Sequence, residues 1–293
     1  MTMKDGARYG EWENVAVEFD AGIAWVSLNR PHKRNAMSPA LNDDMVDVLD
    51  RLEADEAVKV VVITGAGEAF TAGMDLKEFF RATDGLPPIP QLRARRSMAL
   101  WQGQMLMQYA KPTIAMVNGW CFGGGFMPVV ACDLAIAAEE AQFGLSEINW
   151  GIVPAGNVTR AVVAAMPLRE AMLYVLTGRT FDGRKAAQMN LVNEAVPAAE
   201  LRAHTRKLAL ELMGKNPTAL RACKAAVRNV QGMPWEVSGD YLSAKAAQAR
   251  LLDDEGGRSL ALKQFLDEKS FKPGLGGYAR QPDGRPAGAA DES

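Results

Sequence analysis

Two short apolar runs near the start of the chain have the pattern of paired strands. Residues 15–19 and 23–28 are rich in β-branched and aromatic side chains, and the turn Asp20-Ala21-Gly22 separates them. Apolar runs joined by such a turn are typical of a β-hairpin. Residues 58–64 form a nearly continuous β-branched run, which indicates a strand buried on both faces.

Helical spacing begins at Ser38-Pro39, where a serine N-cap is followed by proline in the first turn. Apolar residues then recur at three- and four-residue intervals up to about residue 54, which predicts an amphipathic helix. We expect a short strand over 70–76 that turns into a helix over 77–81. A Gly- and Pro-containing loop over 84–90 precedes a predicted long helix over 92–109.

Strand and helix patterns alternate again in the middle of the chain. Residues 113–117 and 134–137, and the stretch around Phe143, read as strands, and residues 126–131 read as a helix. Beyond Val158 helical patterns dominate, with one short apolar stretch at 193–196. The predicted helices span 160–166, 169–176, 182–189, 197–214, 217–230, 235–253 and 258–268.

These patterns divide the chain into three parts. We predict an α/β core of strand-strand-helix units over residues 12–196 and a helical region over 197–273. The end of the chain, 274–293, is rich in Gly, Pro and Ala, and we expect it to be disordered.

A glycine-rich junction stands between a strand and a helix of the core. Residues 118–125 read Asn-Gly-Trp-Cys-Phe-Gly-Gly-Gly, so the backbone N–H groups at this turn are not shielded by side chains. Such a junction can hold a phosphate, or stabilise negative charge that develops on oxygen during a reaction. The alternative is a tight turn that needs room for packing.

Charge and residue usage narrow the classes of function. The net charge is -2 with basic and acidic residues interspersed, so no footprint for nucleic acid or an anionic membrane is evident. No apolar run has the length of a membrane span, and we expect a cytoplasmic protein. The spacing of the three cysteines and two histidines argues against disulfides, against a metal site and against a Ser-His-Asp mechanism. Acid/base chemistry by a carboxylate is therefore the first candidate.

Three motifs in this order resemble the crotonase, or enoyl-CoA hydratase/isomerase, superfamily. They are Ala-Gly-Met-Asp-Leu-Lys-Glu at 72–78, the glycine-rich junction, and Phe-Gly-Leu-Ser-Glu-Ile-Asn-Trp-Gly-Ile at 143–152. The strings look most like those of the hydroxycinnamoyl-CoA, or feruloyl-CoA, hydratase-lyases. The resemblance covers roughly residues 12–273, and it implies a spiral of strand-strand-helix turns followed by a helical oligomerisation region, with trimers or paired trimers.

The resemblance also implies a set of site residues. The N–H groups of Met74 and Gly124 would form an oxyanion hole for the thioester carbonyl, and Glu147 would be the acid/base. The CoA thioester enters as substrate, and no cofactor or metal is implied. Further substrate-binding positions are Lys33, Arg34, Ala72, Leu76, Phe79, Gly123, Met127, Ser146, Trp150, Tyr241 and Ser243.

Elementary chemistry supports these roles. Two N–H donors can stabilise the enolate formed when water adds to a conjugated thioester, each by ~3 kcal/mol. Glu147 can carry protons both in the hydration and in a later retro-aldol cleavage. Because Leu145, Ile148 and Trp150 surround it in the sequence, we predict a desolvated carboxyl with a raised pKa. The alternative is a surface glutamate on a loop.

Several positions depart from the pattern of the family. Simple hydratases carry a second glutamate where this chain has Met127, and the hydratase-lyases carry a serine there. The lyases also have tyrosines at the positions of Phe79 and Ser243, and Tyr241 points to another side of its helix. Phe79 and Trp150 would still form an aromatic wall, unless Phe79 is a plain core residue.

Other functions remain open at this point. An ordinary enoyl-CoA hydratase that acts on another acyl group is the alternative enzyme. A non-catalytic scaffold that binds acyl-CoA or RNA is the other class, because a fold does not fix a function.

Overall fold

The computed structural model describes residues 10–272, 274 and 276–280. The chain forms two compact units, Met1–Ala209 and Leu210–Ser293. The first unit therefore extends beyond the predicted core of 12–196, and the predicted oligomerisation role of 197–273 stays a prediction. Most of the predicted disordered tail, residues 281–293, lies outside the described residues.

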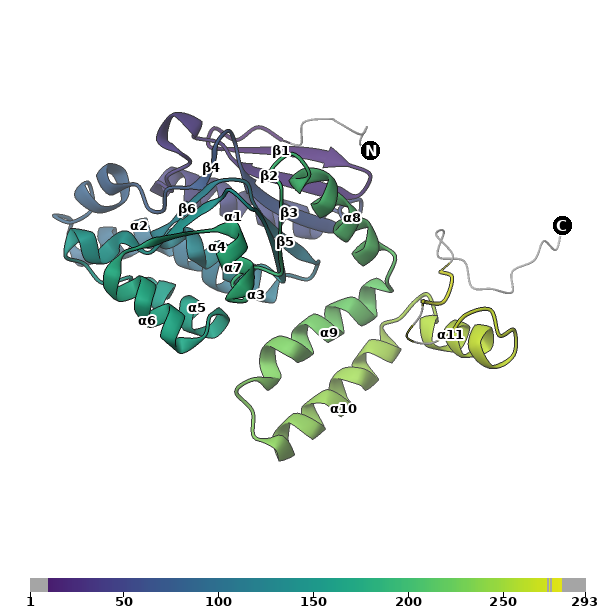
Figure 1. Ribbon diagram of the computed structural model, residues 1–293. Coiled ribbons are helices and arrows are strands. Elements are labelled where there is room, and N and C mark those ends of the chain that lie inside the picture. Colours follow the sequence, from purple (N-terminus) through teal and green to yellow (C-terminus); the bar gives the residue numbers. More distant parts are fainter. Residues whose placement is uncertain (1–9, 273, 275, 281–293) are drawn as a thin grey trace. The chain divides into compact units, whose positions relative to one another are not determined.

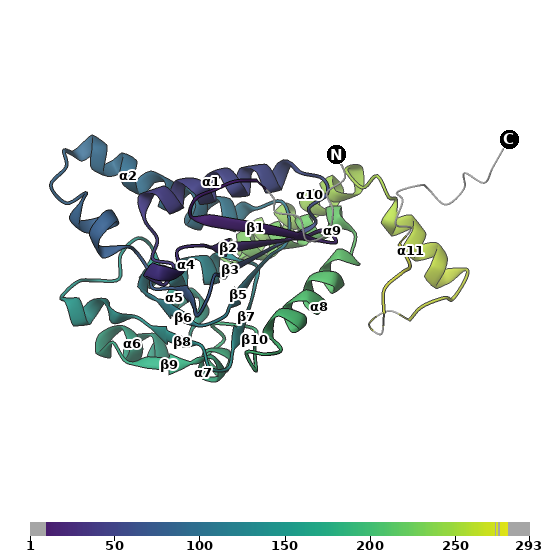
Figure 2. The ribbon, with the colours of Figure 1, turned by 90° about the horizontal axis from the view of Figure 1, so that it is seen from above.

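A six-stranded sheet forms the centre of the first unit (Figures 1 and 2). Its order is β1-β2-β3-β5-β7-β10, and only the β1 and β2 pair is antiparallel. The predicted hairpin is confirmed, with Val15 opposite Leu28. All residues of β3 are buried, as its β-branched run predicts. The strands are Val15–Asp20, Ile23–Leu28, Val60–Gly65, Thr113–Val117, Leu134–Ala138 and Glu194–Val196.

A second sheet of four short strands, ordered β4-β6-β8-β9, accompanies the first. Its strands are Ala69–Thr71, Trp120–Phe122, Gln142–Gly144 and Thr180–Asp182. The strands β4, β6 and β8 each follow one strand of the large sheet along the chain, and they pair in parallel with one another. The predicted strand-strand-helix repeat is thus confirmed. Because parallel neighbours end at the same edge, the segments that follow β4, β6 and β8 converge.

Helices and helical turns fill the connections of the first unit. The predicted N-cap is confirmed, because the Ser38 side chain accepts a hydrogen bond from Leu41 N. The helices are α1 (Pro39–Ala54), α2 (Pro88–Leu100), α3 (Leu106–Gln108), α4 (Phe126–Ala131), α5 (Val158–Ala165), α6 (Leu168–Thr177), α7 (Gly183–Gln188) and α8 (Leu201–Met213).

The predicted helix over 92–109 and strand over 70–76 differ from the structure. Helix α2 begins at Pro88, inside the expected loop, because proline is well suited to the first helical turn. A π-helical segment, η3 (Trp101–Met105), separates α2 from α3. The strand stops at Thr71, and Leu76–Arg81 form another π-helical segment, η2.

The second unit contains the end of α8 and three further helices: α9 (Pro217–Val230), α10 (Trp235–Leu251) and α11 (Gly257–Leu266). These agree with the predicted helices within two residues at each end. Helices α9 and α10, all of whose residues are described, contain no buried residue. Within the described part of the expected tail, Ala279 exchanges two backbone hydrogen bonds with the side chain of Gln264, and the predicted disorder stays a prediction.

Candidate active site

The three segments that carry the sequence motifs lie directly after the three parallel short strands. Met74 follows β4, and Gly123 and Gly124 follow β6 in the 3-10 turn η4 (Gly123–Gly125). Glu147 follows β8 in the 3-10 turn η5 (Ser146–Trp150). The repeat of the fold therefore brings residues together that are far apart in the sequence.

The backbone N–H groups of the turn that contains Met74 are all engaged except one. Ala72 N donates to Arg34 O at 2.8 Å, and Asp75 N donates to Met37 O at 3.0 Å. Gly73 N donates to the hydroxyl of Thr71 at 3.1 Å. The Met74 N–H finds no acceptor among the described residues. It is therefore free to donate to a ligand.

Glycines allow this turn to pack directly on the glycine-rich junction. Gly73 has a φ of +89°, and a Cβ there would lie 2.7 Å from Phe122 O and 3.3 Å from Gly124 N. A side chain at this position is therefore excluded by the backbone of the junction. Gly124 lies in the first turn of η4, where N–H groups have no acceptor within the helix. No acceptor for the Gly124 N–H is found among the described residues either, so donors from two touching segments are available, as an oxyanion hole requires.

The carboxyl of Glu147 lies against the same junction. A Cβ on Gly123, whose φ is +50°, would be 2.9 Å from Glu147 Oε1. The other oxygen, Oε2, is buried and has no hydrogen-bond partner among the described residues. Burial raises the pKa of Glu147 above its ordinary value of 4.5, and a hydrogen bond from its own backbone works weakly against this. The predicted raised pKa is confirmed.

The reason for this burial differs from the predicted one. Leu145 is buried, but Ile148 is exposed and Trp150 is 65% exposed. The last two side chains therefore do not desolvate the carboxyl, and its contact with the glycine turn gives it shelter instead. The neighbouring Ser146 is half-buried.

The positions linked to the aromatic end of the substrate are more dispersed. Phe79 in η2 is buried and packs edge-on against Phe80, with ring centroids 5.2 Å apart. This favours core packing for Phe79, and with Trp150 exposed the predicted aromatic wall stays a prediction. Met127 is buried in α4.

Two predicted residues lie in the second unit, on α10. Ser243 Oγ donates to Gly239 O at 2.9 Å, and Tyr241 Oη accepts from Asn229 Nδ2 at 3.1 Å. Both hydroxyls are satisfied within that unit. Their role toward the substrate stays a prediction.

The residues expected at the CoA site lie on segments beside the Met74 turn. Lys33 and Arg34 are exposed, and the backbone of Arg34 bonds to Ala72, which is exposed as well. The Arg34 guanidinium lies 4.7 Å from the ring centroid of Trp120, a residue that the sequence did not single out. Leu76, at the start of η2, is also exposed. The role of these positions toward CoA stays a prediction.

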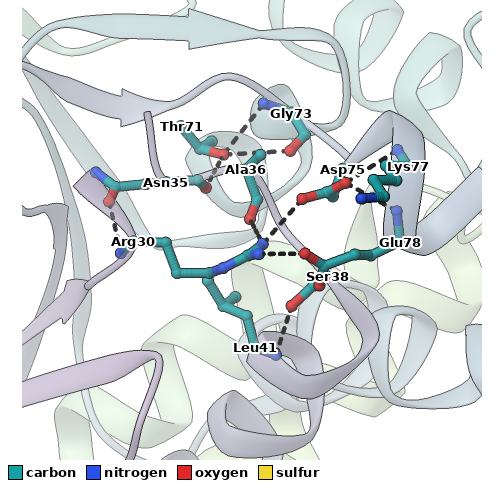
Figure 3. A network of polar contacts seen from close by, with 10 residues as sticks. All are labelled: Arg30, Asn35, Ala36, Ser38, Leu41, Thr71, Gly73, Asp75, Lys77 and Glu78. Atoms are coloured by element: carbon teal, nitrogen blue, oxygen red, sulfur yellow. Dashed lines mark hydrogen bonds and ion pairs between the residues drawn. The ribbon is translucent and has the colours of Figure 1, made fainter. Parts of the chain in front are cut away.

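A second feature not found from the sequence is a polar network behind the Met74 turn (Figure 3). Arg30, which is 6% exposed, contacts Asp75 and Glu78. Burial alone would raise the pKa of Asp75, but hydrogen bonds from the N–H groups of Glu78 and Lys77 and from Arg30 lower it below its ordinary value. In the sequence, Arg30 is one residue of the polar loop that follows β2, and nothing in the pattern links it to Asp75 and Glu78.

Among the residues that the structure describes, no three His, Cys, Asp or Glu side chains gather as a metal site would require. In the same part of the chain, no helix is both long and apolar enough to cross a bilayer.

Comparisons with known proteins agree with this geometry. Residues 18–244 match the family model described as Enoyl-CoA hydratase/isomerase. The chain is 59% identical over 271 residues to hydroxycinnamoyl-CoA hydratase-lyase of Pseudomonas fluorescens, covering 92% of this chain and 98% of that protein. It is 33% identical over 232 residues to (E)-benzylidenesuccinyl-CoA hydratase of Thauera aromatica, covering 76% and 85%.

A solved structure supports the fold. The crystal structure of enoyl-CoA hydratase from Bacillus anthracis superposes with a TM-score of 0.80 at 28% identity, covering 93% of this chain and 100% of that one.

Proposed function

The chain belongs to the enoyl-CoA hydratase/isomerase family, and we propose that it acts as a hydroxycinnamoyl-CoA hydratase-lyase. It would add water to a cinnamoyl-type CoA thioester and cleave the product into an aromatic aldehyde and acetyl-CoA. The observation that carries this proposal is the half-buried Glu147, whose Oε2 is buried without a partner among the described residues, beside a turn in which the Met74 N–H has no acceptor there. The high identity to a relative of that activity supports the choice of reaction.

The first step is hydration of the double bond. The N–H groups of Met74 and Gly124 donate hydrogen bonds to the thioester carbonyl oxygen, which makes the β carbon electrophilic. A water molecule attacks this carbon while Glu147 takes its proton, and negative charge moves onto the thioester oxygen as an enolate. The proton on Glu147 then passes to the α carbon, which gives a β-hydroxyacyl-CoA and restores the carboxylate.

The second step breaks the carbon–carbon bond. Glu147 removes the proton of the β-hydroxyl, the C–O bond becomes the aldehyde carbonyl, and the electrons of the Cα–Cβ bond move to the thioester as an enolate. The same two N–H groups stabilise this enolate. Glu147 returns the proton to the terminal carbon, so acetyl-CoA forms and the carboxyl is ready for another cycle. CoA takes part only as a piece of the substrate, and we propose no further cofactor.

The raised pKa of Glu147 suits a carboxyl that both accepts and donates protons during the reaction. A carboxyl whose ionised form is poorly solvated holds a proton more firmly and is also a stronger base when it is ionised. With no basic side chain bonded to Glu147 among the described residues, the charge is not neutralised locally. Met127 supplies no second carboxyl, so one group has to serve both steps.

An ordinary enoyl-CoA hydratase is the second candidate, favoured by a specific observation. The phenolic hydroxyls of the tyrosines that the lyases carry at the positions of Phe79 and Ser243 are missing here. A phenolic substrate hydroxyl buried without a partner would cost ~1–3 kcal/mol. We therefore expect a weaker preference for 4-hydroxylated rings, or acceptance of methylated ones.

A substrate series separates the two candidates. Purified protein is supplied with feruloyl-CoA, 4-coumaroyl-CoA, 3,4-dimethoxycinnamoyl-CoA and crotonyl-CoA, and aldehyde is measured by chromatography. Release of aldehyde from the cinnamoyl thioesters supports the proposal. Hydration of crotonyl-CoA with no aldehyde from any aromatic thioester would identify a simple hydratase. No turnover of any thioester would support a non-catalytic scaffold.

We further propose that the protein forms a homo-oligomer, a trimer or a pair of trimers. Helices α9 and α10 contain no buried residue, and large apolar side chains such as Val227, Trp235 and Leu251 are exposed on them. Exposed large apolar side chains on helices without buried residues are consistent with an association surface. Light scattering coupled to gel filtration measures the mass, and a single-chain mass would contradict this proposal.

A further inference from the structure

The loop that precedes α1 lies along the Met74 turn, and hydrogen bonds join residues 34–37 of the loop to residues 71–75 of the turn. Arg34 O accepts from Ala72 N, and the Thr71 hydroxyl donates to Asn35 O at 2.7 Å. Met37 N donates to Gly73 O at 2.8 Å, and its carbonyl accepts from Asp75 N. The loop and the turn therefore form one hydrogen-bonded unit.

These bonds fix the direction of the free N–H. Gly73 O and Met74 N belong to one peptide group, and in a trans peptide the C=O and the N–H point in opposite directions. No cis peptide is present among the described residues. Because Gly73 O faces Met37, the Met74 N–H points away from Met37. A rotation of this single peptide plane would move the donor away from the substrate oxygen.

Arg30 holds the loop, the turn and the following helical segment together (Figure 3). Its Nη1 donates to Ala36 O at 2.7 Å and to Asp75 Oδ2 at 3.1 Å, and its Nη2 donates to Glu78 Oε1 at 2.7 Å. The other carboxyl oxygen of Asp75 accepts from the N–H groups of Lys77 and Glu78, and so caps η2. The residue after Met74 is thus anchored from two sides.

We propose that Arg30, acting through Asp75, is a positioning residue for the oxyanion-hole donor Met74 N–H. This inference rests on the proposed function and deepens it. Arginine suits the role because its planar guanidinium donates in fixed directions to three acceptors, which the single ammonium of lysine cannot do. A residue that only stabilised the fold would affect unfolding but would leave the polarisation of a bound thioester unchanged.

The test uses Arg30→Lys and Asp75→Asn in the full-length protein. We expect kcat for feruloyl-CoA to fall by about tenfold to a hundredfold, with KM changed by less than about threefold, because a slightly displaced donor weakens transition-state binding selectively. Arg206→Lys is the matched control. Arg206 lies on α8, outside the three motif segments, and forms a two-bond ion pair with Asp20, through Nε at 2.8 Å and Nη2 at 3.2 Å.

A spectroscopic readout separates positioning from stability. In a Glu147→Gln background that does not turn over, bound feruloyl-CoA should show a red-shifted absorbance band, because hydrogen bonds to the thioester carbonyl polarise the conjugated system. Adding Arg30→Lys or Asp75→Asn should reduce this shift, and adding Arg206→Lys should not. Thermal unfolding of each variant identifies any loss of fold, and either substitution alone suffices for the test.

The outcomes are distinct. If the wild-type protein neither binds nor converts aromatic CoA thioesters, the proposed function itself is wrong. If it converts them but the folded Arg30 and Asp75 variants retain the full absorbance shift, or lose no more activity than Arg206→Lys, the positioning role is wrong.

Discussion

At the scale of single residues, one carboxyl and two backbone N–H groups account for the chemistry. Glu147 has no charged partner among the described residues, and its environment favours the protonated form. Such a group is costly for folding and useful for proton transfer, a combination that is common at active sites. Two predictions belong to this scale.

The first concerns activity. Glu147→Gln keeps the shape of the side chain but removes the proton acceptor, so aldehyde release should fall by ~10²–10⁴-fold in kcat. KM should change little, because the amide still fits beside Gly123. Steady-state assays with feruloyl-CoA measure both constants. Retention of most of the turnover would show that another group moves the proton.

The second concerns stability and pH. Burial raises the pKa of Glu147 in the folded protein. The contribution of this carboxyl to the free energy of unfolding is therefore fully present below the pKa of the unfolded state, and it is lost as the pH rises through the pKa of the folded state. Glu147→Gln cannot ionise, so it should unfold at a higher temperature than the wild type at pH 7, and at nearly the same temperature at pH 4. Glu56→Gln, which alters an exposed carboxyl, is the control. A lower unfolding temperature at pH 7 for Glu147→Gln would contradict this prediction.

At the scale of elements, the site depends on short strands and tight turns that stack on one another. Gly73 lies so close to Phe122 O that a side chain has no room, and the obstacle is backbone rather than a movable side chain. Gly73→Ala should therefore separate the two halves of the oxyanion hole and lower kcat by about a hundredfold.

A substitution at Gly67 distinguishes the effect of the steric clash at Gly73 from the effect of backbone strain. Gly67 has a similar φ of +74°, but a Cβ there would meet only Pro31 Cβ at an ordinary 3.5 Å. Gly67→Ala should lose stability from strain and keep most of its activity per folded molecule. Equal losses of kcat in the two variants, measured on folded fractions, would exclude the proposed clash.

The sequence predicted most of the long elements and the short strands β8 and β10, but it missed other short elements. The hairpin, α1 and β3 have enough residues for a periodic pattern, whereas β6 and β9 have three residues each and carry none. The π-helical segments η2 and η3 were also missed, because an extra residue in a helical turn depends on packing.

The same distinction holds for the site. The motifs with Met74, Gly124 and Glu147 could be recognised in the sequence because, although each is ordinary by itself, their order and spacing together resemble one family. The role proposed for Arg30 could not, because its partners Asp75 and Glu78 lie more than forty residues away and meet it only in the folded chain. The contact of the Glu147 carboxyl with Gly123, which removes it from solvent, likewise forms only in the folded chain.

At the scale of the whole molecule, the second unit carries apolar side chains that it does not bury itself. If α9 and α10 form the contacts between chains, a charge placed there should break the assembly. Trp235→Asp combined with Leu251→Asp should reduce the mass in solution toward that of one chain. Ile89→Asp, which changes an exposed apolar residue of α2, should leave the mass unchanged.

The most direct test of the central claim is the product balance for feruloyl-CoA. The account predicts that the wild-type protein forms aromatic aldehyde and acetyl-CoA in equal amounts, followed together by chromatography and mass spectrometry, and that Glu147→Gln forms neither at a comparable rate. Accumulation of a β-hydroxyacyl-CoA without aldehyde, or undiminished formation of both products by Glu147→Gln, would contradict it.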